Sequence, residues 1–126
     1  MKSPQGLFAM LLALAVTAGC SRPHEGSELA AALPGDPDRG AALIEKVDCG
    51  VCHRIPGILR ARGRVGPPLT NFAQRAFIAG QVPNSPETLV RWIQNPPSIA
   101  PDTAMPVLGI SEGDARDIAA YLYTLN

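Results

Sequence analysis

The sequence predicts a single all-α domain in which three to five short helices surround a bound group. Two observations favour helices: three segments carry helix start signals, and no stretch shows the sustained alternation of apolar and polar residues that indicates strands. The third observation concerns the core. The 126 residues include only six Phe, Trp or Tyr, against 13 Pro and 12 Gly. A domain this small therefore has few large side chains to fill its core. A bound prosthetic group could occupy the core instead.

Each expected helix follows from local signals. The first begins at Asp36-Pro37, because Asp is a favoured N-cap and Pro a favoured first helical residue. The second begins in the same way at Ser85-Pro86 and must end at Pro96-Pro97. The third follows Ser111, which opens a sequence resembling a capping box and a run of apolar residues at helical spacing. A further short helix is expected near residues 69–77, and almost no sheet.

The charges argue against one class of function. The chain has 11 basic and 11 acidic residues and no net charge. A nucleic-acid-binding protein normally has a basic excess, so nucleic acid is not an expected partner.

The first residues have the features of an export signal, and we predict a lipoprotein-type signal peptide over residues 1–19. Lys2 precedes an uncharged stretch over residues 6–19, too short to span a bilayer. The segment ends at Cys20 in a sequence resembling a bacterial lipobox, which predicts lipidation of Cys20. Ordinary cleavage after Ala18 and an uncleaved anchor remain alternatives. All three place the domain on the periplasmic, oxidising side of a bacterial membrane, lipid-anchored in the first case and soluble in the second.

A linker is expected between this signal and the domain. Residues 20–35 mix Pro, Gly, Ser, Glu and Ala without periodicity, which is typical of a flexible tether. One weak helical turn is expected at residues 28–33. The domain then occupies residues 36–126.

The residues Cys49-Gly50-Val51-Cys52-His53 form a C-x-x-C-H motif, which is typical of c-type haem attachment. Two thiols at this spacing can each add to one vinyl group of the same porphyrin, and His53 can then ligate the iron. Two alternatives are weaker. A redox disulfide requires a β-α-β context that is absent, and a structural zinc site requires four ligands. We therefore predict one covalent haem c.

The sixth ligand of the iron is predicted to be Met105. It is the one Met that remains after export, and it lies between Pro101 and Pro106 in a turn-rich loop that suits a ligand better than a core residue. The rival imidazole, His24, lies on the tether. A thioether ligand favours the ferrous state and raises the reduction potential. Burial of the haem also favours the ferrous state and raises the reduction potential. The residues expected to bury it are Ile44, Leu69, Trp92, Val107 and Leu122.

Several further segments carry a family resemblance. They are an apolar helix leading into CGVCH, the sequence Gly66-Pro67-Pro68-Leu69, residues 88–105 and residues 117–122. With these motifs, residues 36–125 resemble the small monohaem class I cytochromes c. The likeness is strongest to the cytochrome c domain of bacterial haem-copper oxidase subunit II, through residues 82–96, although the oxidase's membrane hairpin and copper domain are missing.

The resemblance implies roles for further residues. It implies that the Pro67 carbonyl accepts a hydrogen bond from His53, and that Arg75 lies near a haem propionate. It also implies that Trp92 and Thr103 contact the haem, and that the first and last helices cross where Gly40 meets Tyr121.

The function expected from these features is electron transfer, without catalysis. Quinol-oxidising complexes or dehydrogenases are the expected donors, and terminal oxidases or reductases the expected acceptors. A fixed subunit of an oxidoreductase complex is one alternative, and a haem peroxidase or gas sensor with an open sixth position is another. The region after His53 is basic, with Arg54, Arg60, Arg62 and Arg64. It is either a solvated loop or a docking surface for a partner with an acidic face. Alternatively, one of these arginines pairs with a haem propionate.

Overall fold

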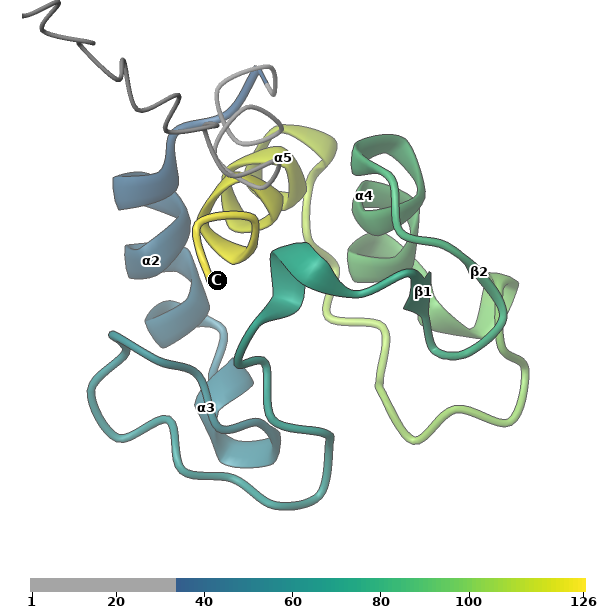
Figure 1. Cartoon of the computed structure of the whole chain (residues 1–126), viewed down its shortest axis with the longest axis horizontal. Helices are drawn as coiled ribbons and strands as arrows, with labels where there is room; N and C mark the ends of the chain where they lie inside the picture. Colours follow the sequence, from purple (N-terminus) through teal and green to yellow (C-terminus); the bar gives the residue numbers. More distant parts are fainter. Residues whose placement is uncertain (1–33) are drawn as a thin grey trace, which may run out of the picture.

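The computed structural model describes residues 34–126, and its elements are helical apart from one short hairpin (Figure 1). The predicted signal peptide, Cys20, His24 and nearly all of the tether lie outside the described residues. Within them, no helix has the length and apolar character needed to cross a membrane. The α-helices are α2 (Pro37–Lys46), α3 (Cys49–Cys52), α4 (Pro86–Gln94) and α5 (Glu112–Leu122), joined by the 3₁₀ turns η1 (Phe72–Gln74) and η2 (Pro96–Ser98). The predicted all-α class is confirmed.

The predicted helix starts are also the observed ones. The Asp36 carboxylate accepts hydrogen bonds from the amides of Asp38 and Arg39 at 2.9 and 3.2 Å, and Pro37 is the first residue of α2. The Ser85 hydroxyl caps α4, and the Ser111 hydroxyl caps α5. These side chains satisfy amide groups that have no partner within the helix.

Helices α2 and α5 cross closely (Figure 1). The contact depends on Gly40, where a Cβ atom would overlap the backbone carbonyl of Asp117. The atoms nearest to Gly40 belong to Asp117 and Ile118, about one helical turn before Tyr121, the residue expected there. The Asp117 carboxylate accepts from the Asp36 amide at 2.8 Å and from Nε of Arg39 at 2.5 Å, which ties the two helices together.

The segment between α3 and α4 differs from the prediction. The helix expected over residues 69–77 is reduced to η1, and the chain then forms a hairpin of β1 (Phe77–Ile78) and β2 (Val82–Pro83) with Ile78 opposite Val82. The turn between the strands contains Ala79 and Gly80, both with positive φ. Tertiary contacts around this loop override the weak local helix signal.

The buried residues form a shell, with a cavity inside it. Ile44, Leu89, Ile93, Ile118 and Leu122 come from α2, α4 and α5, and they are at most 5% exposed. All five also line one cavity. The three longer helices therefore pack around a space at the centre of the domain.

Candidate functional site

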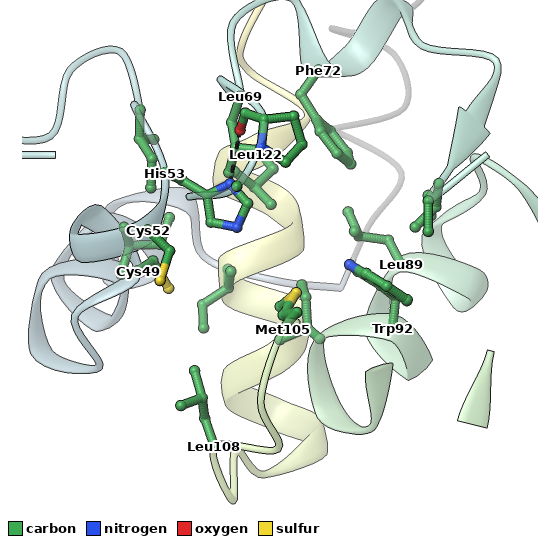
Figure 2. A pocket seen from close by; sticks show the side chains of 18 of the residues that line it. Cys49, Cys52, His53, Leu69, Phe72, Leu89, Trp92, Met105, Leu108 and Leu122 are labelled. Atoms are coloured by element: carbon green, nitrogen blue, oxygen red, sulfur yellow. Dashed lines mark hydrogen bonds between the residues drawn. The ribbon is translucent and has the colours of Figure 1, made fainter. Parts of the chain in front are cut away.

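The two cysteines lie on α3, at one side of the cavity. A left-handed residue, Asp48 (φ 57°), separates α2 from α3 and turns the chain so that α3 begins at Cys49. Cys49 and Cys52 are half-buried, line the cavity and form no disulfide. Figure 2 shows their sulfur atoms beside one another. Burial raises the pKa of the Cys49 thiol, so the protonated form is favoured there.

His53 follows directly, where the chain leaves α3 in an extended conformation. Nδ1 of its ring donates a hydrogen bond to the Pro67 carbonyl at 2.8 Å, as the resemblance implied. In the neutral ring this bond fixes the tautomer and the plane, with the proton on Nδ1 and the free lone pair on Nε2. Gly66 lies against the imidazole so closely that a Cβ atom would overlap the ring. The absence of a side chain at Gly66 is therefore part of how the ring is positioned.

The loop that carries Pro67 is held by Arg75. The Arg75 guanidinium donates to the carbonyls of Pro68 and Thr70, and it lies over the Phe72 ring, 5.4 Å from the centroid. Arg75 also lines the cavity. Its place beside a propionate stays a prediction, and the structure gives it a further task, which is to hold the segment that orients His53.

Asn84 was not anticipated from the sequence, yet it connects this loop to the end of the chain. Its Nδ2 donates to the carbonyls of Phe72 and Arg75 at 3.2 and 3.0 Å, and its Oδ1 accepts from the Tyr123 hydroxyl at 2.8 Å. Tyr123 is fully buried, and burial raises the pKa of its phenol far above the ordinary value. Asn84 therefore joins a neutral, buried tyrosine to the loop that holds His53.

Met105 lies on the opposite side of the cavity. Figure 2 shows its side chain facing the His53 imidazole across the open space, with Trp92 nearby. The Met105 amide donates to Oγ1 of Thr103 at 3.2 Å, which shapes the loop just before the thioether. Trp92, Thr103 and Met105 all line the cavity, and their contacts with the haem stay a prediction.

The cavity has a volume of about 360 Å³ and is lined mainly by apolar side chains. Of the residues expected to enclose the haem, Ile44, Leu69, Trp92 and Leu122 line it. Val107 does not, and the expectation for it was wrong: it is 57% exposed. Leu108 lines the cavity in its place. Between Pro106 and the left-handed Gly109 (φ 67°), the loop turns Leu108 inward and Val107 outward.

These features fit a covalently attached haem. The free thiols of Cys49 and Cys52 lie at one edge of an apolar cavity. The His53 imidazole, whose Nδ1 is hydrogen-bonded to Pro67, lies on one side of it, and the Met105 thioether lies on the other. In residues 34–126 no group of three or more His, Cys, Asp or Glu side chains is placed to hold a metal ion. A zinc site therefore has no donor set in this part of the chain.

The site thus defines a haem-binding domain, and the comparisons place it in a family. The family model for cytochrome c matches residues 37–126. Cytochrome c2 of Rhodopila globiformis is 33% identical over 107 residues, which cover 75% of this chain and 97% of that protein. The chain belongs to the cytochrome c family, whose members are electron carriers, and it carries covalent haem c.

Two further comparisons refine this result. Subunit 2 of cytochrome c oxidase from Alkalihalophilus pseudofirmus is 36% identical over 89 residues, which cover 70% of this chain but 25% of the subunit. The chain thus spans about a quarter of that relative. The crystal structure of cytochrome c2 from Rhodobacter sphaeroides matches with a TM-score of 0.53 at 24% identity, covering 72% of this chain and 96% of that one. This match confirms the cytochrome c fold.

Proposed function

We propose that this protein is a periplasmic electron carrier that moves single electrons between respiratory complexes, with His53 and Met105 as the axial ligands of its haem iron. Cys49 and Cys52 are the proposed points of thioether attachment. When bound, the haem supplies an iron that changes by one electron between the ferrous and ferric states. The other tasks belong to the side chains around it.

The observation that carries the proposal is the position of His53 and Met105 on opposite sides of one apolar cavity (Figure 2). Two protein ligands leave no open coordination position for a substrate, which separates a carrier from a peroxidase or a gas sensor. Met/His ligation also raises the reduction potential.

The surroundings of both ligands favour small structural change when an electron moves. His53 is held by the Pro67 carbonyl and by contact with Gly66, and the Met105 loop is held through Thr103. Ile44, Leu89 and Leu122 exclude water from the inner side of the cavity. A preorganised, largely dry site requires little rearrangement between the two oxidation states.

Spectroscopy of the purified holoprotein tests this proposal. We expect a low-spin spectrum in both oxidation states, a positive midpoint potential in a redox titration, and no rapid binding of carbon monoxide by the ferrous form. Rapid binding of carbon monoxide would contradict stable ligation by Met105 and would favour the gas-sensor or peroxidase alternative.

The location and partners belong to the same proposal. We infer that the chain is exported, lipidated at Cys20 and held at the periplasmic side of the membrane by residues 20–35, so that the domain stays near membrane-bound respiratory complexes. A quinol-oxidising complex or dehydrogenase would reduce it, and a terminal oxidase or reductase would oxidise it. The C-x-x-C-H motif together with an export signal supports this location.

A second candidate function is that of a fixed subunit in a larger oxidoreductase complex. The similarity to cytochrome c oxidase subunit 2 favours it. Purification of the tagged protein in mild detergent separates the two candidates. A stoichiometric oxidoreductase partner would identify a subunit, and a protein that purifies alone and is reoxidised by added membranes would identify a carrier.

A further inference from the structure

One side-chain amide of the domain forms its hydrogen bonds to segments that lie far from it along the chain. Asn84 stands shortly before α4, and its Nδ2 donates to the carbonyls of Phe72 and Arg75, at the start and just past the end of η1. Its Oδ1 accepts from the hydroxyl of Tyr123, the residue after α5. Three of the four hydrogen bonds open to an amide side chain are therefore made within the domain.

Tyr123 is the buried partner of this amide. Its side chain is fully buried, and its ring lies edge-on to Phe72 with the ring centroids 5.9 Å apart. Because burial raises the pKa of the Tyr123 phenol far above its ordinary value, the hydroxyl keeps its proton and remains a donor at neutral pH. A buried hydroxyl that lost its acceptor would be left with an uncompensated desolvation penalty, so the bond to Asn84 is strongly favoured.

Backbone hydrogen bonds hold the same segments together. The Asn84 amide donates to the Ala76 carbonyl at 3.0 Å, and the Ala73 amide donates to the Leu125 carbonyl at 3.1 Å. In Figure 1 the end of the chain, marked C, lies beside the teal segment that contains η1. The turn η1 is thus held between the residues before α4 and the residues after α5.

A short series of contacts leads from η1 to the His53 ring. The Arg75 guanidinium donates to the carbonyl of Pro68, the neighbour of Pro67. The Pro67 carbonyl in turn accepts from Nδ1 of His53 at 2.8 Å. Since Asn84 binds the Arg75 carbonyl at 3.0 Å, it fixes the residue that holds this loop. The position of the carbonyl that faces His53 therefore depends on η1 and on the amide that holds it.

From these contacts we propose that Asn84 and Tyr123 are positioning residues that set the strength of the hydrogen bond from Nδ1 of His53, and through it the reduction potential of the haem. This inference rests on the proposed electron-transfer function, in which His53 ligates the iron. Neither Asn84 nor Tyr123 lines the cavity. They act through η1 and Arg75, and not by contact with the haem.

The direction of the effect follows from the chemistry of the imidazole. A hydrogen bond donated by Nδ1 raises the basicity of Nε2, and a more basic ligand favours the ferric iron, which carries the greater charge. Displacement of the Pro67 carbonyl weakens this bond and should therefore make the potential more positive. Entry of water into a loosened domain acts in the opposite direction, because more polar surroundings favour the ferric state. The sign of the change thus separates positioning from a general loss of packing.

Redox titration of the holoprotein measures this sign. Asn84→Ala removes all three side-chain bonds, and we expect it to raise the equilibrium constant for reduction about threefold, less than the roughly tenfold effect of removing a direct partner of a ligand. For one electron this corresponds to about 30 mV, at 59 mV per tenfold change. Tyr123→Phe removes the hydroxyl and keeps the ring beside Phe72, so it should give a smaller change of the same sign.

Ser111→Ala is the matched control for lost stability. It removes the cap of α5, and among the described residues the Ser111 side chain bonds only to Asp114. Loss of a cap destabilises a protein, but no contact leads from this cap to His53, so the potential should stay unchanged. A potential that falls in Asn84→Ala, or that moves equally in Ser111→Ala, would overturn the proposal.

Nuclear magnetic resonance of the ferrous holoprotein follows the hydrogen bond itself. In Asn84→Ala the Nδ1 proton of His53 should move upfield and exchange faster with water. The double variant with Tyr123→Phe should match Asn84→Ala alone, because both residues act through one bond. An unchanged Nδ1 resonance would overturn the proposal. If the ring protons of His53 in the unaltered holoprotein show no shift from the haem, the result would instead contradict ligation by His53 and with it the proposed function.

Discussion

Met105 is the residue on which the distinction between a carrier and a ligand-binding haem protein depends. Met105→Ala should leave the sixth position vacant or filled by water, and it should lower the midpoint potential because thioether ligation is lost. A redox titration and the absorption spectrum measure both effects. Val107→Ala is the matched control, since Val107 lies on the same loop but is exposed and outside the cavity lining. An unchanged potential in Met105→Ala would mean that another group ligates the iron.

A substitution at Cys52 tests the covalent attachment of the haem. Cys52→Ala leaves at most one thioether, so the yield of holoprotein with covalent haem should fall sharply. Mass spectrometry of the purified chain and a haem stain of the denatured protein measure this yield. Cys20→Ser removes a different cysteine and should retain normal haem content. A normal content of covalent haem in Cys52→Ala would refute two-point attachment.

Single residues of the site can be predicted from the sequence where the chemistry itself requires a fixed spacing. Thioether attachment and ligation of the iron need two thiols and an imidazole close together along the chain, which makes Cys49, Cys52 and His53 recognisable. Gly66 and Asn84 are different, since their importance comes from atoms far away along the chain: Gly66 is close to the His53 ring, and Asn84 bonds Phe72, Arg75 and Tyr123. No local pattern encodes such contacts.

The crossing of α2 and α5 is the element contact with the sharpest steric requirement. Gly40→Ala should destabilise the holoprotein by about 1–3 kcal/mol, because the added Cβ overlaps the Asp117 carbonyl. Gly113→Ala is the control on α5. It meets nothing within 4 Å, and it should raise the stability by about 0.5 kcal/mol through better helix propensity. Denaturant unfolding measures both, and similar changes in the two variants would contradict the close crossing.

Asp117 makes the same crossing sensitive to acid. Burial acts to raise the pKa of this carboxyl, but the hydrogen bond from Asp36 and the contacts with Arg39 outweigh it and lower the pKa below its ordinary value. A carboxyl with a lowered pKa in the folded state stabilises the fold above its unfolded pKa, and the contribution is lost as pH falls through the folded pKa.

Asp117→Asn should therefore lower the thermal midpoint at neutral pH and flatten its decline below about pH 4. Thermal melts of both proteins between pH 2 and 7, within the range set by the ordinary carboxyl pKa near 4, measure the difference. Asp38→Asn is the control, because the Asp38 side chain forms no hydrogen bond or ion pair among the described residues. Parallel pH profiles for all three proteins would contradict the assignment to Asp117.

The elements themselves were predictable where their signals are local. Asp36, Ser85 and Ser111 cap the helices that they were expected to cap, since a cap contacts amides only two or three residues away. The hairpin at residues 77–83 was missed, and so was the inward turn of Leu108 in place of Val107. Both are set by packing around the cavity and by left-handed residues, which the sequence pattern does not reveal.

At the scale of the whole molecule, the proposed anchor decides where the electron carrier works. Cys20→Ser should release the protein from the membrane into the soluble periplasmic fraction, because a lipidated Cys20 would be the attachment point. Fractionation followed by a haem stain measures this distribution. Cys49 and Cys52 are unchanged in this variant, so its haem content and spectrum serve as the internal control. Retention of Cys20→Ser in the membrane would count against lipidation.

The cavity also makes the stability of the fold depend on the group that fills it. If this space of about 360 Å³ is left unfilled, the apolar side chains that line it lose their packing partners on that side. We therefore expect the polypeptide without its porphyrin to be much less stable than the holoprotein. We also expect folding of the domain to be coupled to attachment of the pigment, because a group that binds the folded state alone stabilises it.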